Sequence, residues 1–285
     1  VLRVLDRAKG IVPIDELGLH DEALSELKLM MARPEGIILV TGPTGSGKTT
    51  TLYSMLGYVR SIEVNIMTLE DPVEYPMDMI RQTSINEVLR MDFANGIRSL
   101  MRQDPDIILV GEIRDTDTAE MALRAAMTGH QVYSTLHTNS AIGTIPRLVD
   151  IGIKPEILTG NIIGIMGQRL VRKLCPHCKT SHPAMDVEKT LLGLNDTDTI
   201  EIFDANGCEK CAHIGYKGRL AILEVLRVDS ELDEMIAEHM SLGKIKKHLH
   251  QQNFKTLADD AARRVIEGIT SLDEVSRVVD LTDRL

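Results

Sequence analysis

The sequence predicts an α/β protein with an open parallel sheet, helices on both faces, a cysteine-rich element and a C-terminal helical region. Three observations predict this class. Apolar runs alternate with helical patterns in the first half, a glycine-rich loop joins one such run to a helix, and the four cysteines form two C-x-x-C pairs. Because strands that alternate with helices favour parallel pairing with right-handed crossovers, we expect a parallel sheet.

The expected elements follow the hydrophobic spacing along the chain. A helix is expected at 21–32 with Asp21 as its N-cap, and the helix after the glycine-rich loop should end near Val59. The following elements are expected in order: strands at 65–70 and 80–85, a helix at 92–101, a strand at 106–110, a helix at 118–127, a strand at 131–136, further helices to about Lys173, a small helix at 187–192, and three or four short helices over 229–285. With the usual crossovers, we expect the strand that ends near Glu112 to lie beside the strand before the glycine-rich loop.

Four regions are expected from these elements. Residues 1–20 are predicted to be the end of a preceding N-terminal domain and a linker, and 21–172 the nucleotide-binding domain. Residues 173–222 should form the tetracysteine element and 223–285 a helical subdomain, in which Ser230 with Asp233 and Ser271 with Glu274 resemble capping boxes. The chain does not begin with Met and its first residues are too charged for a signal peptide, so we expect it to be the C-terminal part of a longer protein.

Composition narrows the function classes. The chain has 285 residues, of which 43% are hydrophobic and 26% charged, as is typical of a globular protein with a sizeable core. Its net charge of −10 argues against nucleic acid as the main partner, since phosphate binding draws on a basic surface. No apolar run approaches the length needed to span a bilayer, so we expect any membrane role to come through partners.

The glycine-rich loop carries the strongest signal. Gly42, Gly47, Lys48 and Thr49 fit G-x-x-x-x-G-K-[ST], the phosphate-binding loop of nucleoside triphosphatases. Its glycines allow positive φ, which turns backbone N–H groups toward phosphate oxygens. Lys48 can then reach the β- and γ-phosphates, and the Thr49 hydroxyl can ligate Mg²⁺. The alternative is a glycine-rich turn that matches by accident. The predicted nucleotide-binding residues are Gly42, Pro43, Thr44, Gly45, Ser46, Gly47, Lys48, Thr49 and Thr50.

Carboxylates near strand ends are candidates for the chemistry of hydrolysis. An ATPase needs one carboxylate near Mg²⁺ and another beside the attacking water. Asp106 opens a buried strand and Glu112 closes it, so we expect Glu112 on the metal side and Asp106 as a solvated strand start. Glu70, Asp71 and Glu74 follow a neighbouring strand and could supply the base. The alternative for each is a carboxylate that caps a helix or turn.

Two histidines bracket one strand. His137 falls at the phosphate-side end, where it can donate a hydrogen bond to a γ-phosphate or else cap the next helix. For His130, at the opposite end, we expect a structural role.

The cysteines fit C-x₂-C-x₂₉-C-x₂-C, at Cys175, Cys178, Cys208 and Cys211. Four thiolates complete a tetrahedral zinc site with no open position, so we predict a structural zinc ion. This usage suits a reducing compartment better than disulfides. The alternative is two unrelated thiol pairs, since a redox C-x-x-C needs only one pair.

Five motifs in one order resemble a known family, and the resemblance covers nearly the whole chain. The chain is similar to the secretion ATPases of type II secretion systems and type IV pilus assembly, members of the RecA-like P-loop superfamily. Its tetracysteine element is similar to that of secretion and pilus-extension members, whereas retraction motors typically lack one. The motifs are GPTGSGKT at 42–49 (Walker A), LEDPVEY at 69–75 (aspartate box), RQDPDIILVGEIRD at 102–115 (Walker B), TGHQVYSTLHTN at 128–139 (histidine box) and QRLVRKLCPHC at 168–178 (entry to the tetracysteine element).

The resemblance implies a RecA-like P-loop parallel sheet and Mg²⁺-dependent hydrolysis of ATP, with Zn²⁺ as a structural ion. Glu74, the last glutamate of the aspartate box, is the implied base, beside Lys48, Glu112 and His137 as further catalytic residues. In such motors ATP binds between two lobes, and arginines reach it from an N-terminal lobe of which Arg3 would be a remnant.

The resemblance also implies partners and a location. The implied assembly is a cytoplasmic homo-hexamer that drives pseudopilus or pilus assembly. Platform and adaptor proteins would hold it at the bacterial inner membrane. Two other classes stay open. One is a zinc-ribbon adaptor that binds nucleotide without turnover. The other is a nucleic-acid motor, which the acidic balance and the scarcity of aromatic residues disfavour.

Overall fold

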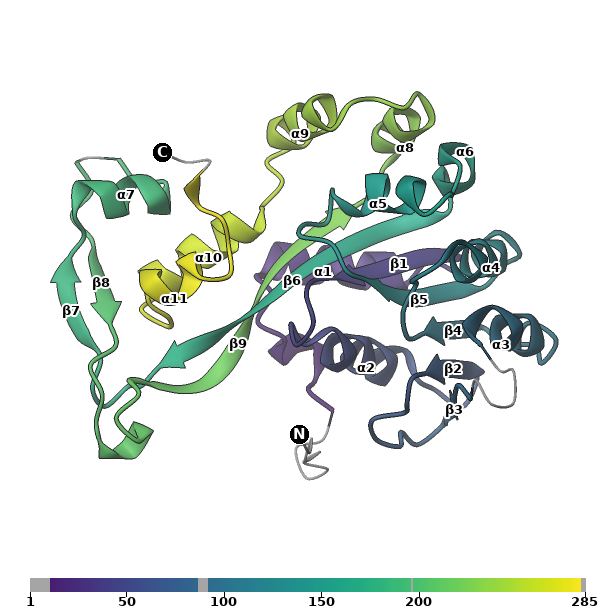
Figure 1. Cartoon of the computed structure of the whole chain (residues 1–285), viewed down its shortest axis with the longest axis horizontal. Helices are drawn as coiled ribbons and strands as arrows, with labels where there is room; N and C mark the ends of the chain where they lie inside the picture. Colours follow the sequence, from purple (N-terminus) through teal and green to yellow (C-terminus); the bar gives the residue numbers. More distant parts are fainter. Residues whose placement is uncertain (1–10, 87–91, 196, 283–285) are drawn as a thin grey trace. The chain divides into compact units, whose positions relative to one another are not determined.

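The computed structural model describes residues 11–86, 92–195 and 197–282 (Figure 1). Arg3 therefore lies outside the described residues. The chain divides into two compact units. The first comprises the residues up to Thr44, Lys48–Gly167 and Val225–Phe254; the second comprises Gly45–Gly47, Gln168–Glu224 and Lys255–Leu285.

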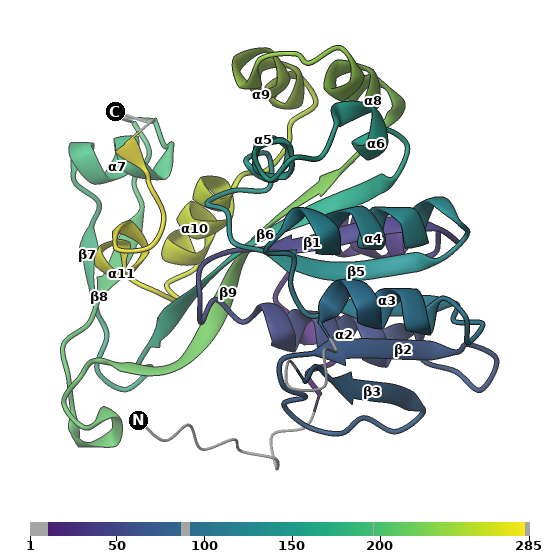
Figure 2. The same ribbon diagram turned by 45° about the vertical axis from the view of Figure 1, so that its right-hand side comes forward.

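The first unit carries most of the α/β layers. Helices α3 and α4 cover one face of its sheet, and α1 and α2 lie on the other (Figure 2). Its elements are η2 (Ile14–Glu16), α1 (Asp21–Met31), β1 (Gly36–Thr41), α2 (Lys48–Val59), β2 (Ile66–Glu70), β3 (Ile80–Ser84), α3 (Phe93–Leu100), β4 (Ile107–Val110), α4 (Thr116–Met127), β5 (Gln131–Leu136), α5 (Thr144–Asp150), α6 (Pro155–Leu158), α8 (Ser230–Ala237) and α9 (Leu242–Gln251).

Seven strands of the described chain form one sheet in the order β3-β2-β4-β5-β1-β6-β9, where β6 (Ile162–Leu174) and β9 (Tyr216–Arg227) pass from one unit to the other. The pairs from β3 to β6 are parallel. The α/β class with a parallel sheet and helices on both faces is therefore confirmed. The prediction that β4, the strand before Glu112, lies beside β1, the strand before the glycine-rich loop, is wrong, because β5 lies between them. Local patterns determine strands, whereas their order depends on how the crossovers pack.

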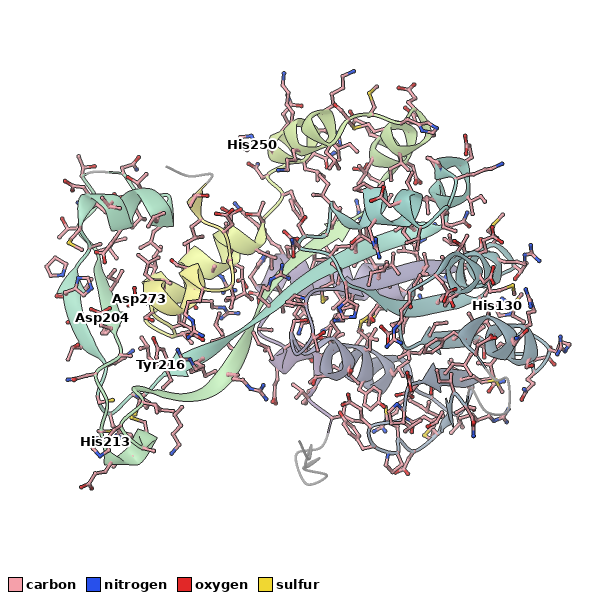
Figure 3. The ribbon with its side chains drawn as sticks, in the orientation of Figure 1. His130, Asp204, His213, Tyr216, His250 and Asp273 are labelled. Carbon is pink, nitrogen blue, oxygen red and sulfur yellow. The ribbon has the colours of Figure 1, made fainter. Side chains whose placement is uncertain are left out.

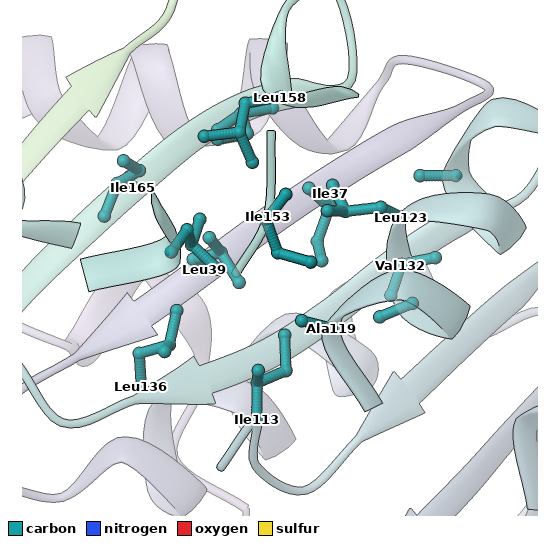
Figure 4. Close-up of a cluster of buried hydrophobic side chains, with 14 of the residues drawn as sticks. Ile37, Leu39, Ile113, Ala119, Leu123, Val132, Leu136, Ile153, Leu158 and Ile165 are labelled. Atoms are coloured by element: carbon teal, nitrogen blue, oxygen red, sulfur yellow. The ribbon is translucent and has the colours of Figure 1, made fainter. Parts of the chain in front are cut away.

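Alternate side chains of the central strands build the core of the first unit. Ile37 and Leu39 of β1 and Val132 and Leu136 of β5 pack with Leu123 of α4 (Figure 4). Both faces of β1, β2, β4 and β5 are buried. Burial on both faces explains why these strands are continuous apolar runs in the sequence.

The second unit surrounds the cysteines. Its own core contains Val171, Ile222, Ala261 and Val265. Its remaining elements are β7 (Thr180–Pro183), α7 (Asp186–Leu192), β8 (Glu201–Asp204), η4 (Glu209–Cys211), α10 (Leu257–Ile266) and α11 (Leu272–Ser276), with β7 antiparallel to β8.

The division of the chain differs from the expected boundaries. Helices α8 and α9 belong to the first unit, because Leu232 of α8 and Leu249 of α9 are buried in the same core as β5. Helices α10 and α11 belong to the second unit. The predicted run of helices to Lys173 ends early, since α6 stops at Leu158 and β6 follows.

Two predicted helix caps are also wrong. The His20 Nδ1 atom, and not Asp21, accepts the Ala23 N–H of α1 at 3.3 Å. For α8 the cap is Asp229 in place of Ser230, since Asp229 has the extended backbone that an N-cap requires. Ser271 does cap α11, but only half of the predicted box forms, because the Glu274 carboxylate pairs with Arg172 instead.

Candidate active site

The carboxyl ends of β1 and β5 meet at the edge where the glycine-rich loop begins. The Thr138 N–H donates to Thr41 Oγ1 at 3.0 Å, and the Gly42 N–H donates to the Leu136 carbonyl at 3.4 Å. These bonds hold the start of the loop beside the residues that follow β5. The edge is the one at which open α/β sheets bind their ligands.

The three glycines of the loop adopt the positive φ that the motif predicts. Gly42, Gly45 and Gly47 have φ values of 153°, 80° and 91°, as their residue type predicts. Lys48 is the first residue of α2, and its Nζ donates to the Gly42 carbonyl at 2.8 Å and the Pro43 carbonyl at 3.1 Å. These carbonyls hold the ammonium at the loop, where phosphate oxygens can replace them as partners. The other predicted nucleotide-binding residues lie along the same loop and the first turn of α2: Thr44, Gly45 and Thr50 are exposed, Thr49 is half-buried and Ser46 is buried.

Glu112 and His137 form a pair at the same sheet edge. The Glu112 carboxylate makes an ion pair with Arg114, and its Oε2 lies 3.5 Å from His137 Nε2. Burial, followed by the positive charge of Lys48, lowers the pKa of His137. The imidazole is therefore neutral at pH 7 and can donate one hydrogen bond. His137 does not cap α5, whose N-cap is Gly143.

The aspartate box separates its three carboxylates into different environments. Glu70 is buried and accepts hydrogen bonds from Tyr53, from Thr68 Oγ1 at 2.5 Å and from Gln82 Nε2 at 3.2 Å. A carboxylate held in this way is unsuited to act as a base. Asp71 is exposed and Glu74 half-buried, and the Glu74 carboxylate makes no hydrogen bond or ion pair within the part of the chain that the structure describes.

Two residues that we expected to be structural lie away from this edge. The exposed Asp106 precedes β4, and its Oδ2 accepts the Asn65 N–H at 2.7 Å. His130 precedes β5 and its Nδ1 lies 2.9 Å from the Ala125 carbonyl, at the C-terminal end of α4 (Figure 3). The strand-start position of Asp106 is confirmed, and the contact of the His130 ring with α4 supports the structural role predicted for it.

The cysteines of the second unit form a separate cluster. All four sulfur atoms lie within 4.8 Å of one another, with 4.0 Å between Cys175 and Cys208 and 3.8 Å between Cys178 and Cys211. A tetrahedron of thiolates around Zn²⁺ has edges of about 3.8 Å, since the Zn–S distance is about 2.3 Å. The spacing therefore fits a tetrahedral metal and excludes disulfides.

Backbone amides also prepare the cluster for a cation. The N–H groups of Gly207, Cys208 and Gly215 point at cysteine sulfurs at 3.2–3.3 Å. Burial raises the pKa of the Cys178 thiol to about 12, whereas at Cys211 the N–H groups of Cys208 and Gly215 outweigh burial and lower the pKa of the thiol to about 6. His213 lies in the turn after η4, beside this cluster in the chain (Figure 3). A set of four thiolates is a donor set that Zn²⁺ prefers.

Three polar residues near the active site escaped the sequence analysis. Tyr53 and Gln82 contact Glu70 and the aspartate-box loop, and the buried Gln168 donates from Nε2 to the Ser46 carbonyl at 2.7 Å within the second unit. Gly47 leaves space for Gln168, because a Cβ at Gly47 would lie 2.9 Å from its Nε2. Gln168 is the first residue of the QRLVRKLCPHC motif, and membership of that motif was the only indication in the sequence that it could matter. Tyr53 and Gln82 lie in ordinary helix and strand patterns.

Comparisons with known proteins agree on one family. The family model described as "Type II/IV secretion system protein" matches residues 1–277. The chain is 45% identical over 278 residues to the type II secretion system protein E of Pseudomonas aeruginosa, with 98% of this chain and 55% of the relative covered. It is 42% identical over 291 residues to the type IV pilus assembly ATPase TfpB of Acinetobacter baylyi, with 99% and 48% covered.

A solved structure shows the same fold. The crystal structure of the pilus retraction motor PilT with bound ADP superposes with a TM-score of 0.72 at 30% identity, covering 99% of this chain and 71% of that one. The chain spans about half the length of the curated relatives above, 55% and 48%. In the described part of the chain, no helix combines the length and apolar character of a membrane span.

Proposed function

Since the chain belongs to the type II/IV secretion system protein family, we propose that it is the ATP-hydrolysing part of a secretion or pilus-assembly motor. The observation that carries the proposal is the sheet edge at which Lys48 begins α2 and the Glu112–His137 pair follows neighbouring strands. Lys48 supplies a positive charge to phosphate, and the pair supplies a carboxylate and a neutral imidazole. The ADP bound to PilT supports nucleotide as the ligand.

Each residue of the edge has a proposed role. Loop N–H groups and Lys48 bind the triphosphate, and the Thr49 hydroxyl with Glu112 would hold Mg²⁺. When bound, Mg²⁺ neutralises phosphate charge during transfer. His137 donates a hydrogen bond toward the γ-phosphate. Glu74 takes a proton from the attacking water, because Glu70 is enclosed by three hydrogen bonds whereas the Glu74 carboxylate is unengaged within the described residues.

We assign Zn²⁺ to the four cysteines as a structural ion. The donor set and the sulfur spacing fit a tetrahedral site, and four protein ligands leave no position for a substrate. The ion would fix the turns around Cys175 and Cys208, from which β7 and β8 extend.

The relatives support wider proposals for the full-length protein. We propose that it forms a cytoplasmic homo-hexamer, that this hexamer associates with the bacterial inner membrane through platform and adaptor proteins, and that it extends a pilus or pseudopilus. Both a type II secretion protein and a type IV pilus assembly ATPase are similar to this chain at nearly the same identity, 45% and 42%. Their similarity supports both branches equally.

The test is phosphate release from ATP by the full-length protein that contains this chain, with and without Mg²⁺. We expect turnover that needs Mg²⁺ and is independent of DNA. ATP binding without phosphate release would favour the zinc-ribbon adaptor, and turnover that requires DNA would favour the nucleic-acid motor.

A further inference from the structure

We infer that Tyr53 is a positioning residue that holds the loop carrying Glu74 in place for attack on the γ-phosphate. The inference rests on the proposed function, because Glu74 is the base only in that proposal. Tyr53 lies on α2, the helix that Lys48 begins, and its side chain is fully buried. One rigid element thus carries both the phosphate-binding lysine and the hydroxyl that contacts the Glu74 loop.

The Tyr53 hydroxyl is the centre of a buried network. It donates to the Glu70 carboxylate and accepts the Glu74 backbone N–H at 3.4 Å, and the Gln82 Nε2 also lies 3.4 Å away. The two hydrogens of the Gln82 amide are shared among the Tyr53 hydroxyl, Glu70 and the Tyr75 carbonyl, so the Glu70 carboxylate and the Glu74 N–H are the main partners of the phenol. At 3.4 Å the bond from the Glu74 N–H is at the long end of hydrogen-bond distances, so a small shift of the hydroxyl would break it.

Glu70 fixes the direction of that hydroxyl. Its carboxylate accepts a hydrogen bond from Thr68 Oγ1 at 2.5 Å, on the same face of β2. It accepts another from Gln82 Nε2 at 3.2 Å, on β3. Burial and the hydrogen bond to Glu70 raise the pKa of Tyr53, so the phenol stays protonated and always donates toward Glu70. Its acceptor side consequently faces the Glu74 loop.

Gln82 extends the network to the far end of the loop. Its Oε1 accepts the Met77 N–H at 2.7 Å, and its Nε2 donates to the Tyr75 carbonyl at 3.2 Å. The Tyr75 ring also packs edge-on against the Tyr53 ring, with 4.7 Å between centroids. The backbone at Glu74, Tyr75 and Met77 is therefore held by hydrogen bonds with the buried Tyr53 and the half-buried Gln82.

A purely structural role explains this arrangement less well. A phenylalanine would fill the same space, and a buried hydroxyl costs free energy unless it is fully bonded. The hydroxyl bonds with the loop that carries the proposed base, and a displacement of about 1 Å at such a position can slow catalysis by about 10²-fold.

The experiment compares Tyr53→Phe with Tyr133→Phe in the full-length protein. Tyr133 is equally buried, and its hydroxyl donates to Gln131 Oε1 at 2.6 Å on β5, so its variant removes a buried hydrogen bond away from the Glu74 loop. We expect Tyr53→Phe to lower kcat by roughly 10- to 100-fold and to change KM for ATP by less than about twofold. Tyr133→Phe should change both by less than about twofold.

A second arm combines Tyr53→Phe with Glu74→Gln. Because a misplaced base matters only while the base is present, Tyr53→Phe should slow Glu74→Gln by less than about twofold. Normal kcat in Tyr53→Phe, or a full additional loss in the double variant, would overturn the inference and leave the function intact. Normal turnover in Glu74→Gln would overturn the proposed role of Glu74 itself. If Tyr53→Phe does not fold, Gln82→Met tests the same network, with the same losses expected.

Discussion

Each unit holds a lysine ammonium on backbone carbonyls, but the groups around the two lysines differ. In the first unit, Lys48 Nζ bonds with carbonyls of the glycine-rich loop, and the Glu74 carboxylate is unengaged within the described chain. In the second unit, Lys179 Nζ donates to the Gly268 carbonyl at 2.8 Å and also packs on an aromatic ring, 4.2 Å from the Phe203 ring centroid. The arrangement at Lys48 and Glu74 suits a ligand that binds and dissociates, and the arrangement at Lys179 suits a permanent structural contact.

Loss of Lys48 gives the largest expected effect. Lys48→Ala should slow phosphate release by at least roughly 10³-fold and weaken ATP binding, because in the proposed site its ammonium supplies positive charge to the phosphates. Phosphate release and ATP affinity are measured in the full-length protein. The matched control is Lys179→Ala, which should lower the melting temperature but change turnover by less than about twofold. The contrast fails if Lys179→Ala stops hydrolysis or if Lys48→Ala turns over normally.

The next largest effects are expected at the carboxylates of Glu74 and Glu112, and the two substitutions should affect turnover in different ways. Glu74→Gln should bind ATP but release phosphate about 10²- to 10⁴-fold more slowly, as for a lost general base. Glu112→Gln should also slow turnover and require more Mg²⁺, since its carboxylate is assigned to the metal. Titrations of Mg²⁺ on both variants test the assignment. Near-normal turnover in Glu74→Gln together with trapped ATP at an unchanged Mg²⁺ optimum in Glu112→Gln would reverse the roles.

Local sequence patterns predicted elements better than their arrangement. The strand at 131–136 and the helix that ends at Val59 occur as expected, because burial on both faces of the strand leaves a clear apolar signal. The segment Ile162–Leu174 was instead assigned to helices. A long apolar run does not distinguish helix from strand, and pairing with β1 decides in favour of a strand. Gly164 marks that packing, since a Cβ there would lie 2.0 Å from Met30 Sδ.

The candidate site was predictable where one motif carries all of its chemistry. The glycine-rich loop and the cysteine pairs are such motifs, and the structure brings each set together. The Tyr53–Glu70–Gln82 network was not predictable, because its members come from a helix and two strands and meet only in the fold. By its position in the sequence Glu70 falls among the candidate bases, and only its three hydrogen-bond donors reveal its different role.

Zinc removal tests the second unit. Cys208→Ser should lose about one zinc ion per chain and expose residues 173–219 to hydrogen exchange, because a structural metal contributes its binding free energy to folding. ATP affinity should change less than the protection of residues 173–219, since Lys48 and its carbonyl partners belong to the first unit and only Gly45–Gly47 of the loop belong to the second. Metal analysis, hydrogen exchange and nucleotide binding measure these outcomes. Zinc-free wild-type protein with unchanged melting behaviour would contradict the assignment.

The smallest expected effect concerns the protonation of His137. Burial and the Lys48 charge lower the pKa of His137 below 6.5, the ordinary value that it regains on unfolding. As the pH falls through 6.5, the unfolded chain therefore binds a proton that the folded chain does not, and folding stability decreases. His137→Gln removes this difference, so the variant should lose less stability than the wild type between about pH 7.5 and about pH 5.5. The effect should be small, because the His137 side chain is 47% exposed and solvent screens its interactions.

Urea denaturation of the wild type and His137→Gln at the two pH values measures the difference. His130→Gln makes the same substitution at the opposite edge of the sheet, where the ring lies 2.9 Å from the Ala125 carbonyl and not beside Lys48. An NMR titration that places the pKa of His137 above 6.5 would contradict the prediction, since Glu112 would then outweigh Lys48 at the imidazole.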